Sequence, residues 1–327
     1  MRIAVTGSIA TDHLMHFPGR FTDSLVAEKL DKVSLSFLVD ELEVRRGGIG
    51  ANIAFGLGQV GVRATLVGAV GADFAEYRTW LEAHSVDCES VLQSATRATA
   101  RFVCTTDADH NQIASFYAGA MAEARDCRLA PVAERLGGLD LVVIAPDDPE
   151  AMLLHTDECR ALGIPFAADP SQQLARMHRD EVRRLVDGAA YLFTNEYEAA
   201  LIEQKTGWSA DDLLDRVETR VTTLGPLGVL VERRGEPALR VAAVPVAERV
   251  DPTGVGDAFR SGFLAATAWG LSTERACQLG GLLAAYVLET VGTQEYALEP
   301  AAALARLAAA FGAGAAAEVA PHLPRAA

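Results

Sequence analysis

Cysteine is scarce and scattered in this chain. The 327 residues include five cysteines, and no two of them have the C-x-x-C spacing of zinc sites or redox motifs. An odd number of dispersed cysteines also gives no indication of a disulfide framework. We therefore expect five reduced cysteines in the protein interior.

Long apolar runs and a secretory signal are also missing. No apolar segment reaches the roughly 20 residues that a membrane-spanning helix needs. The N-terminal segment MRIAVTGSIATD lacks the cleavage pattern of a signal peptide. The chain is therefore expected to be soluble and cytoplasmic, with no membrane partner.

Basic residues are outnumbered. Lys and Arg total 29 against 44 Asp and Glu, a formal net charge of −15. Such a surface repels phosphate backbones on average, which excludes a nucleic-acid partner. A small anionic ligand still fits if a helix N-terminus or a bound cation holds it. With 50% hydrophobic and 22% charged residues, the composition is that of a globular protein.

Several common catalytic motifs do not occur: the P-loop GxxxxGK[ST], the zinc motif HExxH and the nucleophile elbow GxSxG. One GxGxxG is present at Gly56, Gly58 and Gly61. It closes a helix-like segment instead of opening a helix after a strand, so we interpret it as helix packing. No other feature of the sequence supports a nicotinamide dehydrogenase.

The chain does contain alternating strand-like and helix-like segments. This βαβα order predicts an α/β fold with a mostly parallel sheet covered by helices on both faces. The expected strands are 2–6, 64–70, 139–145, 166–168, 191–194 and 221–224, and the expected helices include 52–60, 73–84, 149–162, 256–269, 273–288 and 300–311.

Three stretches interrupt this alternation. Residues 33–38 alternate as VSLSFL, and residues 98–105 and 112–117 flank a polar turn, which is typical of a β-hairpin. We expect these segments to form a small accessory sheet that acts as a lid. The predicted organisation is one domain over 1–327, with the lid formed by insertions at about 12–46 and 97–118.

A glycine-rich turn precedes a late helix in DPTGVGDAFRSG, residues 251–262. Free N–H groups at a helix start can stabilise negative charge, and Gly254 and Gly256 allow close backbone approach. Asp257 is then placed to act as a base for an attacking hydroxyl. The alternative is a helix-capping acid, but capping does not require the glycines on either side of Val255. A second glycine stretch, RGGIGAN at 46–52, indicates a hinge with Asn52 near a ligand, or simply a loop with a structural Asn.

Together the two glycine stretches resemble the motifs of the ribokinase-like, or PfkB, family of carbohydrate and nucleoside kinases. The C-terminal motif is usually close to DTTGAGD, and here Val255 replaces the customary small residue. The resemblance extends over nearly the whole chain. It implies a three-layer α/β/α fold with a β-sheet lid and a homodimer formed through the lid.

The resemblance also implies a role for each matching residue. Asp257 would be the catalytic base, and the backbone of Gly254 and Gly256 would form the anion hole. The acceptor would be bound by Asp12, Gly48 and Asn52, and ATP by Asn195, Thr223, Gly225, Gly228 and Gly256. Glu198 would hold Mg²⁺ through water. The alternatives are that Glu198 is only a helix-start acid and that Gly225 and Gly228 are plain turn residues.

The acceptor is suggested by segments such as GSIATDHL, ARFVCTTD and ADPSQQLAR, which are similar to actinobacterial adenosine kinases. Phe102 and Phe116 could stack on a purine or merely make apolar contacts in the lid. Polar partners for the base or ribose would be Gln172, Gln173, Ser8 and Ser36. Arg176 would steer phosphates, or form a surface ion pair.

The expected function is therefore an ATP-dependent adenosine kinase that phosphorylates the 5′-hydroxyl and gives AMP in purine salvage. The cofactors would be ATP and Mg²⁺, with a monovalent cation such as K⁺ as a further possibility whose ligands the sequence does not identify. A ribokinase, a fructokinase or another nucleoside kinase is the alternative within the family. A catalytically silent nucleoside sensor is the alternative outside it.

Overall fold

Two β-sheets build the computed structural model, which describes residues 1–25, 32 and 34–324. The large sheet has nine strands in the order β13-β12-β11-β10-β9-β8-β1-β4-β5. All its pairings are parallel except those of β11 with β12 and of β12 with β13. Its strands are β1 (Ile3–Thr6), β4 (Ala64–Val70), β5 (Val91–Gln93), β8 (Leu141–Ile144), β9 (Phe166–Ala168), β10 (Tyr191–Asn195), β11 (Thr219–Thr223), β12 (Val229–Glu232) and β13 (Leu239–Val241).

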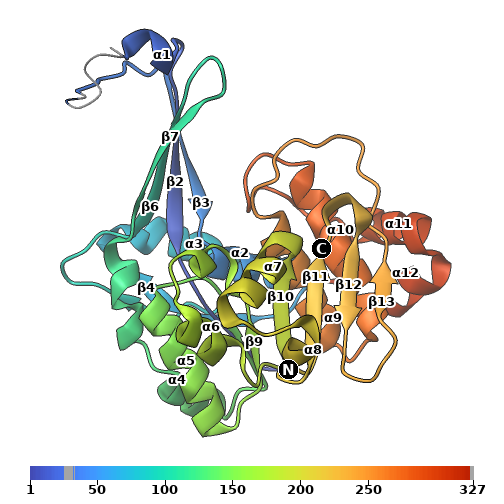
Figure 1. Ribbon diagram of the computed structural model, residues 1–327. Helices are drawn as coiled ribbons and strands as arrows, with labels where there is room; N and C mark the ends of the chain where they lie inside the picture. The colour runs from blue at the N-terminus through green and yellow to red at the C-terminus, as the bar shows by residue number, and fades with distance from the viewer. Residues whose placement is uncertain (26–31, 33, 325–327) are drawn as a thin grey trace.

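Helices cover both faces of this sheet (Figure 1). One face packs against α2 (Ile49–Gln59), α3 (Ala75–Ala83), α9 (Val255–Ala268), α10 (Thr273–Leu288), α11 (Pro300–Phe311) and α12 (Ala313–Val319). The other face packs against α4 (Leu129–Leu136), α5 (Pro149–Leu162), α6 (Arg179–Val186), α7 (Glu196–Thr206) and α8 (Ala210–Leu214). Alternate residues of the strands enter the two cores, as the strand period of two requires: Ile3 and Val5 lie in one, and Ala4 lies in the other. The expected three-layer α/β/α fold is confirmed.

Local signals explain why several helices match their predicted bounds. Helix α5 begins at Pro149 after Asp148, whose side chain accepts hydrogen bonds from the N–H groups of Glu150 and Ala151. It ends at Gly163 in the left-handed conformation that a helix C-terminus favours. Helix α9, which carries the late glycine motif, also begins within one residue of its predicted start.

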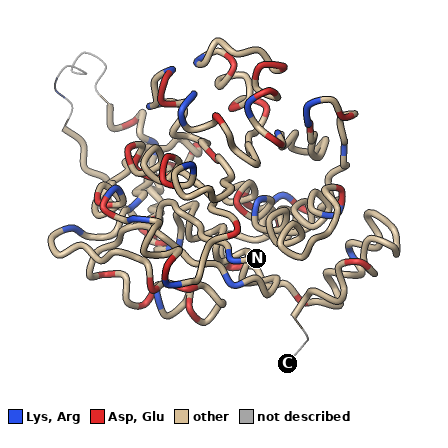
Figure 2. The backbone as a smooth tube through the Cα atoms, turned by 90° about the horizontal axis from the view of Figure 1, so that it is seen from below, with Lys and Arg blue, Asp and Glu red and all other residues tan. Residues whose placement is uncertain are grey.

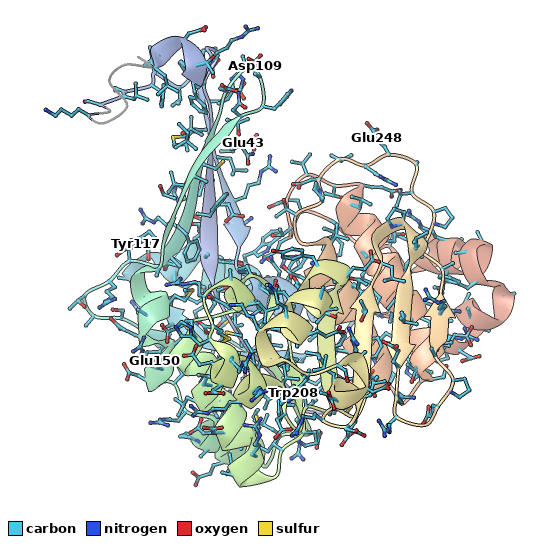
Figure 3. All side chains as sticks on the ribbon, in the orientation of Figure 1. Glu43, Asp109, Tyr117, Glu150, Trp208 and Glu248 are labelled. Atoms are coloured by element: carbon cyan, nitrogen blue, oxygen red, sulfur yellow. The ribbon has the colours of Figure 1, made fainter. Side chains whose placement is uncertain are left out.

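A four-stranded second sheet projects from the body as an arm (Figure 1). Its strands, in the order β3-β2-β6-β7, are β2 (Ala10–His16), β3 (Glu41–Gly47), β6 (Ala100–Thr106) and β7 (Gln112–Tyr117). The antiparallel pairing of β6 with β7 confirms the predicted hairpin. In Figure 3, Tyr117 lies at the base of the arm and Asp109 lies near its tip, beside the short helix α1 (Phe21–Ser24).

The strand expected at 33–38 is wrong for its described part. Val33 lies outside the described residues, and residues 34–38 are not in a strand. Phe37 instead packs against Phe17 and Phe21, with ring centroids 4.9 and 4.8 Å away. Phe37 therefore belongs to an aromatic cluster with Phe17 and Phe21, and the strands beside the hairpin are β2 and β3.

Charge and cysteine placement follow the composition. All five cysteines are buried and unpaired, as expected. Acidic and basic positions are intermixed along the backbone, as Figure 2 shows. Among the described residues, no helix has both the length and the apolar character needed to cross a membrane.

Candidate active site

The late glycine motif forms a tight turn at the N-terminus of helix α9. Gly254 adopts φ 75°, a conformation that favours glycine, and a Cβ atom there would lie 2.8 Å from the Thr293 Cγ2 atom. A Cβ atom on Gly256 would meet the Arg260 guanidinium at the same distance. Glycine at these two positions therefore leaves the space open, and the N–H groups at such a helix start can receive an anion.

This turn lies between two cavities. Thr253, Gly254 and Asp257 line a cavity of about 530 Å³, which we call the acceptor cavity. Gly256, together with the neighbouring Pro252 and Val255, lines a cavity of about 650 Å³, which we call the nucleotide cavity. One short backbone segment is thus shared by two separate binding spaces.

Most residues predicted to bind the acceptor line the acceptor cavity. They are Ser8, Asp12, Gly48, Asn52, Phe102, Phe116, Gln172 and Gln173. Arg176, which was expected to steer phosphates, also lines this cavity. Ser36 is the exception, because it is exposed beyond the tip of strand β3 and lines neither cavity. The contact of Ser36 with the acceptor therefore stays a prediction.

Strand register explains how the arm contributes to the acceptor cavity. Asp12 of β2 pairs with Phe102 of β6, and Phe102 pairs with Phe116 of β7. Residues directly opposite one another in a sheet point to the same face. One carboxylate and two aromatic rings therefore form a row across the underside of the arm. Arg45 of β3 extends this row on the far side of Asp12.

Burial changes the acidity of Asp12. Loss of hydration raises its pKa to about 6, Arg45 opposes that rise, and Asp251 adds to it. A hydroxyl-rich ligand would replace the lost water with hydrogen bonds to both carboxylate oxygens.

Asp257 lies at the floor of the acceptor cavity. Its Oδ2 atom accepts a hydrogen bond of 2.9 Å from Asn52 Nδ2. Burial raises the pKa of Asp257 to about 7, while Asn52 and Arg260 oppose the rise. A carboxyl group with a pKa near neutrality is well matched to accept a proton from an alcohol.

Residues that the sequence analysis did not identify support this acid. Arg260 lies one helical turn after Asp257 and forms a buried ion pair with Asp169, which follows strand β9. Thr293 and Gln294 donate hydrogen bonds to Asn52 from the segment after helix α10. A charged residue inside the otherwise apolar α9 was the available signal for Arg260, whereas Gln294 has no local signal.

The nucleotide cavity contains four of the residues predicted to bind ATP: Thr223, Gly225, Gly228 and Gly256. Its other walls were not predicted. The 242–246 segment after β13 provides one wall, and Gly281, Ala284 and Ala285 of helix α10 provide another. The small side chains on that face of α10 leave room for a flat ligand.

Asn195 and Glu198 line neither cavity. They form a reciprocal cap at the start of helix α7, in which each side chain accepts a hydrogen bond of 2.8 Å from the other's backbone N–H. Glu198 still acts on the site through space, because its charge contributes to the raised pKa of Asp257. Only its Oε2 atom accepts that backbone bond, so a carboxylate oxygen remains for a water on Mg²⁺.

Among the described residues, no group of three His, Cys, Asp or Glu side chains could hold a metal by itself. Magnesium bound with a nucleotide uses one or two carboxylates together with phosphate oxygens and water. Glu198, with one carboxylate oxygen left for a magnesium-bound water, fits that pattern.

Comparison with known proteins agrees with the fold. Residues 9–300 match the model of the pfkB family of carbohydrate kinases. The chain is similar to the nucleoside kinase of Burkholderia thailandensis, solved with inosine, at 34% identity and a TM-score of 0.83, covering 95% of this chain and 99% of that one. A structure of that kinase in complex with ADP-inosine has a TM-score of 0.80 at 35% identity, over 95% of this chain and 96% of that one.

A nucleoside kinase of Methanothermobacter thermautotrophicus is 29% identical over 320 residues, which are 95% of this chain and 96% of the relative. The family match covers most of the chain, including both glycine motifs and the row of residues beneath the arm. The chain therefore belongs to the pfkB family of carbohydrate kinases.

Proposed function

We propose that this protein is an ATP-dependent nucleoside kinase that transfers the γ-phosphoryl group to the 5′-hydroxyl of adenosine and releases AMP and ADP. The observation that carries the proposal is the turn at 252–257, which separates two cavities and presents Asp257 to one of them. An acceptor in one cavity and a phosphoryl donor in the other would approach each other at the glycine backbone of this turn.

Transfer needs an oriented hydroxyl more than a strong base, because the transition state of phosphoryl transfer is loose. Asp257 accepts the hydroxyl proton as the new P–O bond forms. The N–H groups of Gly254 to Asp257 hold the negative charge of the migrating group. Asn52 keeps the Asp257 carboxylate in place through its 2.9 Å hydrogen bond.

ATP binds in the nucleotide cavity, with Thr223, Gly225 and Gly228 beneath it. Mg²⁺, when bound, neutralises phosphate charge, and Glu198 holds it through water. A monovalent cation such as K⁺ stays an untested prediction. Cytoplasmic purine salvage is the setting that we propose, because ATP supplies the phosphoryl group there.

A nucleoside is favoured over a free sugar by the two aromatic rings beneath the arm. Phe102 and Phe116 lie opposite each other on adjacent strands, in the same row as Asp12. A ribose bound at Asp12 would direct its base toward these rings, and rings of this kind contribute by stacking. Free ribose would leave them without a contact.

A second acceptor, inosine, is favoured by two observations. The Burkholderia relative was solved with inosine. Arg176 is the one basic residue among those that line the acceptor cavity of the described chain, and a guanidinium donates readily to the O6 and N7 acceptors of a 6-oxopurine. Adenine presents an N6 amino donor in place of O6, so the two acceptors differ at that position.

Turnover on a substrate panel tests the proposal. ADP release would be measured with adenosine, inosine, guanosine, cytidine, ribose and fructose. We expect the highest kcat/KM with adenosine. Highest activity with inosine would establish the second acceptor, and highest activity with ribose or fructose would refute a nucleoside kinase. No turnover with any of them would favour the nucleoside sensor.

The Asp257→Asn variant tests the assigned base in the same assay. We expect kcat to fall by about 100-fold or more, while nucleoside affinity measured by calorimetry stays near that of the wild type. Asp180→Asn, an exposed acid in the first turn of α6, is the matched control. Near-normal turnover of Asp257→Asn would refute the role of Asp257.

We further propose that the arm acts as a lid and as the contact between two subunits. Every residue of strand β7 is exposed, including Ile113, Phe116 and Tyr117. Exposed apolar residues on an edge strand favour coverage by a second chain. Light scattering that gives only a monomer at micromolar concentration would refute the dimer.

A further inference from the structure

Gln294 lies inside a chain of hydrogen bonds that connects the arm to the acid in the acceptor cavity. It is 1% exposed and belongs to the segment after helix α10. Its side chain bonds to Trp80 and Tyr77 of helix α3 and to Asn52 of helix α2. None of these contacts is between neighbours in the sequence, so only the folded structure brings the hydrogen-bonded residues together.

The direction of these hydrogen bonds is fixed at both ends. Trp80 Nε1 can only donate, and it lies 3.2 Å from Gln294 Oε1. The backbone oxygen of Gly47, at the end of strand β3, can only accept, and it lies 2.9 Å from the Tyr77 hydroxyl. Tyr77 therefore uses its proton on Gly47, and its oxygen accepts from Gln294 Nε2 at 2.5 Å.

This polarity is passed on to Asn52. With Gln294 Oε1 facing Trp80, the Gln294 amide nitrogen faces the Asn52 Oδ1 atom at 2.9 Å. Thr293 Oγ1 lies 3.0 Å from the same Asn52 oxygen. Asn52 must then present its Nδ2 donor to Asp257. With the amide turned over, Asn52 would instead present an oxygen to a carboxylate, and the two would repel each other.

We propose that Gln294 is a positioning residue for phosphoryl transfer: it orients the Asn52 amide so that an N–H donor faces the Asp257 carboxylate. Gln294 also bonds to Tyr77, which donates to Gly47, where strand β3 of the arm meets the body. These hydrogen bonds therefore connect the arm with Asp257. The inference rests on the proposed function, because it assumes that Asp257 receives a proton from the acceptor.

Loss of the Asn52 donor would change the acidity of Asp257 in a definite direction. The charged and titratable groups around Asp257 are Arg260 on the same helix, Asp169 after strand β9, Glu198 on helix α7 and Tyr296 after helix α10. Gln294 carries no charge, so a neutral replacement leaves these groups unchanged. A weaker Asn52 bond stabilises the carboxylate less and therefore raises the pKa of Asp257.

The Gln294→Met variant tests the proposal, since Met has a similar volume and no amide. We expect kcat to fall by about 10-fold or more while the acceptor KM changes by less than about 3-fold. The acidic limb of the kcat profile should also move to higher pH, which a general loss of packing would not produce. The control is Gln278→Met, because Gln278 is a glutamine of helix α10 that is buried (4% exposed) and takes no part in these hydrogen bonds.

Tyr77→Phe provides a second variant that removes one oxygen and keeps the ring. It should lower kcat to a smaller extent and move the acidic limb in the same direction, and it decides the question if Gln294→Met does not fold. The inference is overturned if both acidic limbs stay at the wild-type pH, or if Gln294→Met behaves like Gln278→Met.

The assay would use the best acceptor of the substrate panel, which separates two kinds of failure. Wild-type protein without turnover on any acceptor refutes the proposed function. The positioning role is then judged by carbon NMR titration of Asp257, assigned by comparison with Asp257→Asn. An unchanged titration midpoint in Gln294→Met would overturn it.

Discussion

Arg260 and Asp169 form a two-pronged ion pair in the protein interior. Arg260 Nη2 donates to Asp169 Oδ1 at 2.6 Å, and its Nε lies 2.5 Å from Asp169 Oδ2. The two residues are 6% and 0% exposed. Asp169 follows a strand of the large sheet and Arg260 belongs to the helix of the glycine turn, so the pair ties this turn to the sheet.

Removing one partner of this pair should be costly. We expect Asp169→Asn or Arg260→Met to lower the free energy of unfolding by about 3–5 kcal/mol, because each leaves a buried charge without its partner. Urea denaturation would measure the change. The double variant Asp169→Leu/Arg260→Met should regain most of the lost stability. If it is less stable than both single variants, the pair is not the source of the loss.

The pH dependence of turnover should follow two carboxylates. The pKa of Asp257 is raised to about 7 and that of Asp12 to about 6. Asp257 can take up the hydroxyl proton only when it is ionised, and Asp12 can accept hydrogen bonds through both oxygens only when it is ionised. We expect kcat/KM for the acceptor, measured at saturating ATP, to fall about tenfold per pH unit just below pH 7. The fall should become steeper below pH 6.

Asp12→Asn separates the two groups, since it should remove only the steeper part of the profile. An unchanged slope below pH 6 in this variant would mean that Asp12 does not titrate in the free enzyme. A pH-independent rate between pH 5 and 8 in the wild type would contradict both assignments.

Ionised Asp257 should reduce the stability of the fold. Its pKa rises from 3.8 to about 7 on folding, so between these values the folded state binds more protons than the unfolded state. Stability contributed by this group is therefore lost as the pH rises toward 7. We expect Asp257→Asn to melt about 2 °C or more above the wild type at pH 8. The difference should shrink at pH 5, and a constant difference in Tm would contradict the assignment.

Gly254 offers a test with a close control. Gly254→Ala places a side chain at φ 75° and against Thr293, at the turn between the two cavities. Gly163→Ala imposes a similar backbone conformation, φ 64°, at the end of helix α5, where a Cβ atom has no neighbour within 4 Å. Gly163→Ala should lose about 1 kcal/mol of stability, and Gly254→Ala should lose more because its Cβ atom also meets Thr293. Only Gly254→Ala should lower kcat, by about tenfold or more, and equal activities would refute the turn's role.

Phe102 and Phe116 should matter for nucleosides and not for sugars. Phe102→Ala is expected to raise KM for adenosine by about tenfold, since stacking on a base contributes about 1–3 kcal/mol. Any weak activity on ribose should be unchanged. Tyr117→Ala is the control, because Tyr117 follows Phe116 and points to the opposite face of strand β7. A matching loss on ribose would show that Phe102 supports the arm and does not read the base.

Regular elements of the body could be predicted because local signals and tertiary packing agree there. Strand β4 reads as seven consecutive buried residues, and helices α10 and α11 match their predicted bounds. Strands β2 and β3 were missed because they are not buried like the strands of the body: β2 is mostly part-buried, and the first four residues of β3 are exposed. Leu42 and Val44 do alternate with Glu41 and Glu43, but all four residues are exposed, so burial does not reinforce this pattern.

The same difference applies to the site. The glycine turn and its acid are adjacent in the chain, so their spacing alone indicates an anion-binding helix start. Contacts across long sequence separations gave no such signal: Asn52 and Gln294 are 242 positions apart, and Asp169 and Arg260 are 91 apart. The composition of the acceptor cavity could be inferred, whereas the network that supports its acid could not.

The residues proposed to recognise the acceptor and those proposed to transfer the phosphoryl group lie on different parts of the fold, which bears on how such proteins change their substrates. Asp12, Phe102 and Phe116 lie on the arm, whereas the turn and its acid belong to the body. Residues of an inserted sheet can be substituted without disturbing the residues of the body that carry out the reaction. Transplanting the arm of a sugar kinase onto this body should therefore redirect which alcohol is modified while the transfer step itself is kept.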